Sequence, residues 1–111
     1  MPVRSCYIDV DFTLIGKDGK LYPKVKEALA YMSDVLDYTM MCWSHSGKEH
    51  AKAVCERQDI VMYFDLFLDK PDIIIDDDAK FILKYPKIIK ATSTWGSTFI
   101  ESLFNKKGGK Q

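Results

Sequence analysis

The sequence has no excess of charge of either sign, because 16 Lys and Arg residues offset 16 Asp and Glu residues among 111. Such a chain has no global field with which to attract nucleic acid or an anionic membrane surface, although local patches remain allowed. It also lacks an apolar signal core and any apolar run near the roughly 20 residues that cross a bilayer. We expect a soluble cytoplasmic protein with no membrane partner, for which nucleic acid could serve only as a substrate.

The chain has only three cysteines, an odd number. In a chain without a secretory signal, an odd count argues against a disulfide framework. Cys6 and Cys42 lie in apolar runs and are most simply small core residues. A zinc site could be drawn from the cysteines and histidines Cys42, His45, His50 and Cys55. Their spacing lacks paired close ligands, which disfavours that site.

The composition is that of an ordinary globular protein, with 47% apolar and 29% charged residues. A chain of this length makes one domain with a core that needs no metal or disulfide. We expect a single domain over residues 1–105 and a polar, glycine-containing flexible tail over residues 106–111. The composition leaves open whether the protein forms a homo-oligomer.

Hydrophobic patterning predicts strands that alternate with helices. The predicted strands cover residues 3–8, 38–43, 65–68, 73–75 and 87–92, and the predicted helices cover residues 23–37, 48–58, 79–85 and about 98–104. Residues 60–64 could finish a helix or start a strand. Ile73, Ile74 and Ile75 are β-branched and flanked by acids, which predicts a central, fully buried strand. Thr98 and Glu101 have the spacing of a capping box for the last helix.

This order of elements predicts an α/β fold: a Rossmann-like three-layer sandwich with a mostly parallel central sheet of about five strands and helices on both faces. An Asp-Gly turn within residues 14–22 adds a short flap hairpin after the first strand. In sheets of this kind, ligands bind beyond the carboxyl ends of the strands. The polar clusters that follow the predicted strands are therefore the candidate site.

Two carboxylates, Asp9 and Asp11, leave the first predicted strand together and are followed by the hydroxyl of Thr13. Two close like charges are costly without a cation or a shared proton. Hard divalent ions take oxygen ligands, and one or two carboxylates beside a substrate phosphate make a normal Mg²⁺ site. A polar exit from strand to loop is the simpler alternative for this motif taken alone.

Further polar residues follow the other strands at the same predicted edge. The pattern resembles the haloacid dehalogenase (HAD) superfamily from Tyr7 to about Ala79. The four matching motifs are Asp9-Val10-Asp11-Phe12-Thr13, the apolar strand into Ser44, Lys70-Pro71, and Ile73-Ile74-Ile75-Asp76-Asp77. Their order along the chain and their places on the predicted elements both fit the family.

The resemblance implies a role for each motif residue. Asp9 would be the nucleophile that forms an aspartyl-phosphate, and Asp11 the general acid and then the general base. An aspartate at the second position is typical of phosphatases and phosphotransferases in this superfamily. Ser44 and Lys70 would bind the phosphoryl group, with Lys70 neutralising its charge, and His45 is a further candidate for phosphate binding. The metal ligands would be Asp9, the Asp11 carbonyl, Asp76 and Asp77.

The spacing of the motifs leaves no room for the cap domain that many relatives carry. An open site suits a phosphate on a polynucleotide end, a phosphoprotein or a glycan, and it also admits a sugar phosphate or nucleotide. The short interval from Lys70 to Asp76 resembles small phosphatases of capsule biosynthesis and polynucleotide 3'-phosphatase domains without choosing between them. We therefore expect a Mg²⁺-dependent phosphomonoester hydrolase of the HAD type, without a cap domain.

Other interpretations stay open for parts of this pattern. A receiver domain also gathers acids, a hydroxyl and a lysine, but the Asp9–Asp11 spacing and the early Lys70 favour the hydrolase. A non-catalytic phosphate-binding module on the same kind of fold is the second alternative. The acids before Ala79 could cap a helix. Solvated histidines at positions 45 and 50, and core positions for the aromatics Tyr22, Trp43 and Trp95, are simpler than contacts with substrate.

Overall fold

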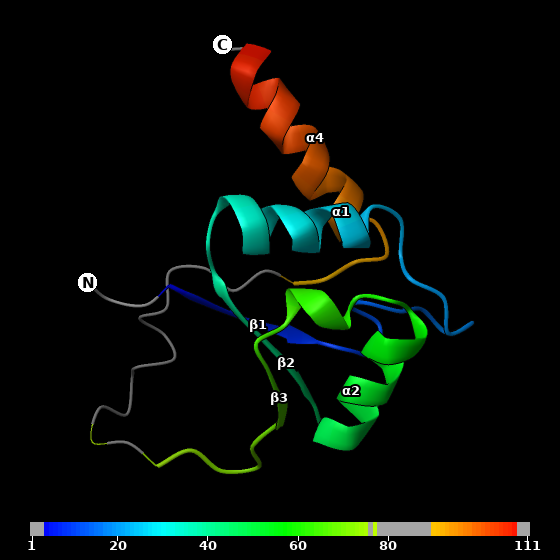
Figure 1. Cartoon of the computed structure of the whole chain (residues 1–111), viewed down its shortest axis with the longest axis vertical. Coiled ribbons are helices and arrows are strands. Elements are labelled where there is room, and N and C mark those ends of the chain that lie inside the picture. Colours follow the sequence, from blue (N-terminus) through cyan, green and yellow to red (C-terminus); the bar gives the residue numbers. More distant parts are fainter. Residues whose placement is uncertain (1–3, 76, 78–89, 109–111) are drawn as a thin grey trace.

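The computed structural model describes residues 4–75, 77 and 90–108, with side chains described up to residue 105. Within these residues, three strands form one parallel sheet in the order β1-β2-β3 (Figure 1). The strands are β1 (Ser5–Asp9), β2 (Thr39–Ser44) and β3 (Leu66–Asp69). Asp9 pairs with Trp43, and Ser44 pairs with Asp69. The carboxyl ends of all three strands therefore meet at one edge of the sheet.

The helices occupy the connections between these strands and the carboxyl-terminal segment. They are α1 (Val25–Ala30), which continues as the π-helical η1 (Tyr31–Val35), α2 (Lys48–Arg57), the 3₁₀ turn η2 (Val61–Tyr63) and α4 (Trp95–Gly108). The helix predicted over residues 23–37 begins later because Lys24 has a left-handed φ of 63°, and Asp37, at φ 57°, follows its end. In the described part of the chain, no helix is long and apolar enough to cross a membrane.

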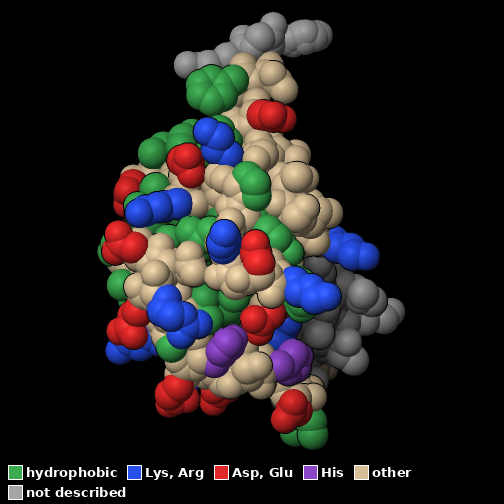
Figure 2. Space-filling view, turned by 90° about the vertical axis from the view of Figure 1, so that its right-hand side faces the viewer, with side chains coloured by type: hydrophobic (Ala, Val, Ile, Leu, Met, Phe, Trp, Pro, Cys, Tyr) green, Lys and Arg blue, Asp and Glu red, His purple; other side chains and the backbone are tan. Residues whose placement is uncertain are grey.

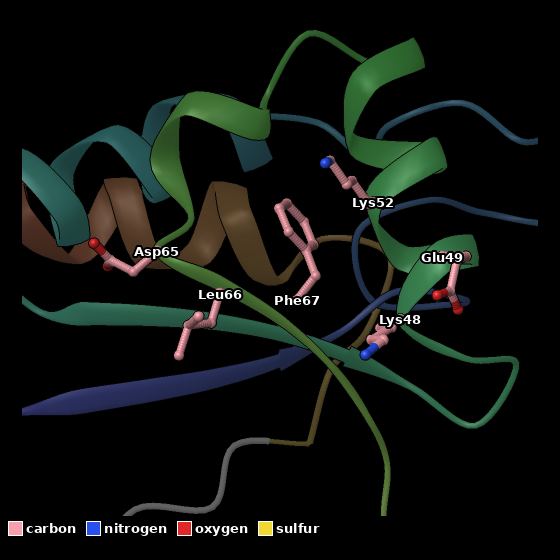
Figure 3. Close-up of a pocket in the computed structure, with 6 residues that line it drawn as sticks. All are labelled: Lys48, Glu49, Lys52, Asp65, Leu66 and Phe67. Carbon is pink, nitrogen blue, oxygen red and sulfur yellow. The ribbon is translucent and has the colours of Figure 1, made fainter.

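The two faces of the sheet differ in burial. Ile8, Met40 and Cys42 point to the face under the helices and are buried, whereas Tyr7 and Leu66 point to the opposite face and are about half exposed. In Figure 3 the helices all lie on one side of the strands. The described part is thus a small α/β fold with one helical layer. It is compatible with a Rossmann-like fold, but the second helical layer of the predicted sandwich is not seen within it.

One hydrophobic core joins the sheet to the helices. Its buried members are Ile8, Val10, Leu14, Ile15, Val25, Ala28, Leu29, Met32, Met40, Cys42, Ala51, Val54, Cys55, Ile60 and Phe64. Leu14 and Leu29 are fully buried, and burial of such a side chain stabilises the fold by about 1.5–3 kcal/mol. The residues that follow the first strand are therefore held by packing, which fixes the loop that carries Asp11.

The predicted buried strand at Ile73–Ile75 is wrong for this structure. The three isoleucines form no strand and are 76%, 51% and 93% exposed. After β3 the chain leaves the sheet (Figure 1), and a β-branched run forms a strand only where a neighbouring strand pairs with it. The described sheet therefore has three strands instead of about five. Residues 90–92 of the predicted fifth strand are also irregular, while residues 79–85 and 87–89 lie outside the described residues.

The last helix is longer than predicted at both ends. It begins at Trp95 and runs to Gly108, so Thr98 lies in its first turns and donates its N–H to the Thr94 carbonyl. Thr98 is consequently no N-cap, and the predicted tail at residue 106 begins in helix. Trp95 anchors this helix, because its indole N–H donates to the Thr13 carbonyl. Gly96 packs so closely on the start of α1 that a Cβ would lie 2.7 Å from the Pro23 carbonyl oxygen.

Candidate active site

The loop after β1 is tightly wound around one backbone carbonyl. The Val10 oxygen accepts the N–H groups of Thr13, Leu14 and Ile15 at 3.2, 2.8 and 3.3 Å. Phe12 has a left-handed φ of 61°, which reverses the chain immediately after Asp11. Val10 is fully buried, whereas the carboxylates on either side of it are partly exposed. The winding therefore presents the predicted nucleophile and the predicted acid to solvent at the edge of the sheet.

The predicted flap hairpin is confirmed. Ile15 bridges Leu21 in antiparallel fashion, and the Gly16 N–H donates to the Lys20 carbonyl at 3.0 Å. Gly19 sits at φ 79°, in the left-handed region that glycine adopts without cost. The Gln58 side chain donates to the Gly19 carbonyl at 2.9 Å, so the far end of α2 holds the tip of the flap.

Ser44 ends β2 and is 2% exposed. Its Oγ accepts the N–H of Ser46 at 3.0 Å. A hydroxyl that accepts one bond still has its own proton to donate. The Ser44 carbonyl accepts two further N–H groups, those of Gly47 at 3.1 Å and Lys70 at 3.0 Å. Ser44 therefore joins the turn into α2 to the residue that follows β3.

Lys70 reaches back across the sheet from the end of β3 to the end of β1. Its Nζ lies 3.9 Å from Asp9 Oδ1, with the two side chains 28% and 35% exposed. The same Nζ lies 5.7 Å from the centre of the Trp43 ring, close enough for a cation–π contact. The predicted nucleophile and the predicted phosphate-neutralising cation are thus brought into contact, although 61 positions separate them.

Asp69 is a site residue that the sequence analysis missed. Its Oδ1 accepts the N–H of Lys48 at 2.7 Å, where α2 begins. A carboxylate is favoured at a helix N-terminus because the unpaired N–H groups and the dipole there attract negative charge. This bond and the one from the Lys70 N–H to Ser44 fasten the end of β3 to the turn before α2. The only signal in the sequence was the acid directly before Lys70.

The two histidines of the chain have different surroundings. His45 is exposed, and the described structure gives it no polar contact, so its phosphate-binding role stays a prediction. His50 lies on α2, and its Nε2 is 3.3 Å from Asp11 Oδ2. Figure 2 shows both histidines on one face, beside acidic and basic side chains. His50 was expected to be solvated, whereas the structure places it against the predicted acid.

The predicted metal ligands are not gathered within the described residues. Asp76 lies outside them, and Asp77 is exposed, two positions after the irregular Ile73–Ile75 segment. Across residues 4–75, 77 and 90–108, no group of three His, Cys, Asp or Glu side chains could hold a metal ion. Of the predicted ligands, Asp9 and Asp11 lie at the edge of the sheet within the described residues.

A cysteine pair lies in the core behind this edge. Cys42 and Cys55 are both fully buried, with their Sγ atoms 3.9 Å apart. The hydrogen bond with Cys55 and then burial raise the pKa of the Cys42 thiol. Burial also raises the pKa of Cys6. Buried, protonated thiols are poor nucleophiles. Cys42 is a core residue, as predicted, whereas Cys6 is only partly buried and packs against the core.

The pocket shown in Figure 3 lies away from these residues. It has a volume of about 410 Å³, lies between α2 and β3, and is lined by Lys48, Glu49, Lys52, Asp65, Leu66 and Phe67. None of the predicted catalytic residues lines it. The Asp65 carboxylate already accepts the Met40 N–H at 2.7 Å. The candidate site is therefore the open strand edge and not this pocket.

Comparison with known proteins adds no relative. No protein-family model matches the chain, and no curated protein or solved structure gives a significant match.

Proposed function

We propose that the chain is a Mg²⁺-dependent phosphomonoester hydrolase of the HAD superfamily that acts through an aspartyl-phosphate on Asp9. The observation that carries the proposal is the contact between Lys70 and Asp9, 3.9 Å apart, with the buried Ser44 ending the strand between them. Three successive strand ends thus supply a carboxylate, a hydroxyl and a cation. This is the set that phosphoryl transfer to a carboxylate needs.

The proposed reaction has two displacements on phosphorus. In the first, an Asp9 oxygen forms a bond to phosphorus, the bond to the leaving alcohol breaks, and Asp11 gives that alcohol its proton. In the second, Asp11 takes a proton from water as the water attacks phosphorus, and phosphate leaves Asp9. Asp11 ends with the proton it first gave away, so the cycle closes without another reactant.

Lys70 and Ser44 have supporting roles in both steps. Lys70 neutralises charge between Asp9 and the phosphoryl oxygens, which lets a dianionic group approach a carboxylate. Within the described residues, the Ser44 Oγ accepts the Ser46 N–H and donates to no other group, so its hydroxyl proton is available for a phosphoryl oxygen. Both groups are held by backbone bonds between the turn before α2 and the end of β3. They need little reorganisation when substrate binds.

Oxygen donors at this edge fit a hard cation. Asp9 would contribute its carboxylate and Asp11 its main-chain carbonyl, with Asp76 and Asp77 as further ligands. Mg²⁺ usually binds one or two carboxylates together with waters and substrate phosphate, so the two described donors are sufficient for a site that forms with substrate. Bound there, the ion would neutralise charge on the transferring phosphoryl group.

The substrate class follows from the openness of the edge. The described segment between β1 and α1 is a short flap, and α2 and η2 fill the segment between β2 and β3. Neither connection adds a lid of its own. A phosphate on a polynucleotide end, a phosphoprotein, a glycan, a sugar or a nucleoside could reach Asp9.

A non-catalytic phosphate-binding or receiver-like module is the second candidate. One observation favours it: Asp77 and the isoleucines before it stand in solvent, so the described residues supply fewer metal ligands than the family pattern implies. Such a module would bind phosphate, or accept it on Asp9, without releasing it catalytically.

Phosphate release from a substrate panel separates the two candidates. The panel contains sugar phosphates, nucleotides, phosphopeptides and 3'- or 5'-phosphorylated oligonucleotides, each with Mg²⁺ and with a chelator. We expect Mg²⁺-dependent release that Asp9→Asn abolishes and that Asp34→Asn, an exposed carboxylate remote from the site, leaves unchanged. Acid-quenched protein should carry a phosphoryl group on Asp9. If no substrate released phosphate, the non-catalytic binding module would be favoured instead.

A further inference from the structure

His50, on α2, contacts the predicted acid. Its Nε2 lies 3.3 Å from Asp11 Oδ2, with the two side chains 35% and 45% exposed. The ring as a whole is partly exposed, yet its Nε2 atom is enclosed by protein. Among the described residues, this nitrogen has no well-aligned hydrogen-bond partner. The nearby Asp11 oxygen is the group that a small side-chain rotation would bring into line.

An enclosed ring nitrogen without a partner is costly. A buried polar group that loses its bond to water and gains none destabilises a protein by about 1–3 kcal/mol. A carboxylate oxygen that is already 3.3 Å away offsets this cost, and bonds to charged acceptors are the stronger ones. The distance and the enclosure are separate observations, and both indicate a bond from the His50 N–H to Asp11.

We propose that His50 is a positioning residue for Asp11. Its Nε2–H donates to one carboxyl oxygen, which leaves the second oxygen to carry the proton that is exchanged with the leaving alcohol and then with water. His50 itself neither gains nor loses a proton in the cycle. The inference rests on the proposed function, because it assigns to Asp11 the role of acid and base.

The surroundings of His50 make it a rigid support. It projects from the first half of α2, whose start is fixed by Asp69 and whose end holds the flap through Gln58. Ala51, the next residue, is fully buried in the core. A side chain on such a helix restricts a carboxylate more firmly than a loop residue would. Misplacing a catalytic group by about 1 Å can reduce a rate by about 100-fold.

The test compares two substrates that differ in their leaving group. An alkyl phosphate needs a proton on its departing oxygen, whereas p-nitrophenyl phosphate releases a stable phenolate without one. We measure kcat/KM, because it includes the steps only up to the breaking of the first phosphorus–oxygen bond. In His50→Ala, we expect kcat/KM to fall about 10- to 100-fold for the alkyl phosphate and less than about 3-fold for the aryl phosphate.

Two further variants make the result specific. His50→Gln keeps an N–H donor at a similar reach and should restore most of the alkyl phosphatase activity. Lys52→Ala changes an exposed residue on the same helix and should leave both substrates unaffected. An equal loss on both substrates, or no loss on either, would overturn the positioning role, since a merely structural residue does not discriminate between leaving groups.

A second measurement shows whether the His50 role alone is wrong or whether the proposed function is wrong as well. Nitrogen-15 spectra of the histidine rings should show an Nε2–H on His50 whose resonance moves in Asp11→Asn but not in Asp34→Asn. If the wild-type protein releases phosphate and this resonance is absent, the positioning role is overturned alone. If the wild-type protein releases none, the proposed function and the catalytic role of the contact both fail, and the resonance still decides whether the contact exists.

Discussion

Lys70 is the cation that contacts the predicted nucleophile in the candidate site. Its Nζ lies 3.9 Å from Asp9 and also rests near the Trp43 ring, so loss of the amine leaves the carboxylate without its cationic partner. We expect Lys70→Ala to lower kcat by about 100- to 1,000-fold, the usual effect of removing a group that stabilises charge in a transition state. Lys17→Ala, an exposed lysine of the flap, is the matched control. A loss confined to KM would show that Lys70 only binds substrate.

The Cys42 thiol makes stability depend on pH. Because the hydrogen bond with Cys55 and burial raise its pKa, the folded protein keeps a proton that the unfolded chain loses above the ordinary thiol value of about 8.5. Above that pH the native state binds more protons than the unfolded state, so the free energy of unfolding falls as the pH rises. We expect a decline of up to about 1.4 kcal/mol per pH unit from this thiol.

Urea unfolding measures this decline when it is carried out at about pH 7, 8.5 and 9.5, which lie below, at and above the ordinary thiol pKa. Cys42→Ala removes the titrating group and serves as the comparison, although the variant is less stable at every pH. The wild-type curve should fall more steeply than the variant curve only above the ordinary thiol pKa. Parallel curves throughout would show that the Cys42 thiol titrates alike in both states.

Single residues of the site were predictable where the chemistry demanded a particular residue type. Asp9 and Lys70 were named from the motif pattern, and the structure puts them in contact. His50 and Asp69 were missed because their roles depend on which way α2 turns and on where β3 ends relative to it. A histidine on an amphipathic helix has the same sequence pattern whether it meets water or a carboxylate.

At the scale of elements, α4 depends on its close approach to α1. A Cβ on Gly96 would lie 2.7 Å from the Pro23 carbonyl oxygen and 2.9 Å from Lys24 and Val25 backbone atoms, which cannot move without shifting the helix. We expect Gly96→Ala to lower the free energy of unfolding by about 1–3 kcal/mol. This loss occurs although alanine is better than glycine by roughly 1 kcal/mol inside an ordinary helix.

Thr98→Ala is the control for that substitution and also tests the start of α4. An N-cap threonine would cost about 1 kcal/mol when replaced by alanine. Thr98 is exposed and its N–H already bonds to the Thr94 carbonyl, so we expect a change within about 0.5 kcal/mol. If Thr98→Ala lowered the free energy of unfolding by the roughly 1 kcal/mol typical of an N-cap residue, a helix start at Trp95 would be contradicted.

The elements that the sequence predicted well have a local cause. The flap follows from an Asp-Gly turn, α2 follows from helical apolar periodicity, and β2 follows from an apolar run that ends at Ser44. The Ile73–Ile75 prediction failed because composition alone does not provide a partner strand. Its residues have strand propensity, but they lie in solvent after the chain has left β3. Strand propensity is realised by pairing and burial, which are tertiary properties.

For the molecule as a whole, the exposure of Ile73–Ile75 and the incomplete set of metal ligands are connected, because both concern the segment that follows β3. The three side chains stand largely in solvent, and the exposed Asp77 lies two positions after Ile75. Exposed apolar runs of this kind are costly, and they commonly mark a surface that another segment or partner covers. If Asp77 completes the proposed Mg²⁺ site, binding of the ion should restrict the end of this segment and the nearby isoleucines.

Amide hydrogen exchange tests this coupling of metal and segment. Without Mg²⁺, the amides of Ile73–Ile75 should exchange at nearly the rate of an unfolded chain, whereas those of the central strand β2 are the most protected. Mg²⁺ with a phosphate analogue should slow exchange in Ile73–Ile75 by about 10-fold or more, since each 1.4 kcal/mol of ordering is a factor of ten. Asp77→Asn should remove this protection, and Asp72→Asn, an exposed acid at the other end of the run, should not. Protection that survives Asp77→Asn would remove Asp77 from the ligand set, and unchanged exchange in the wild type would mean that the open strand edge binds its cation without this segment.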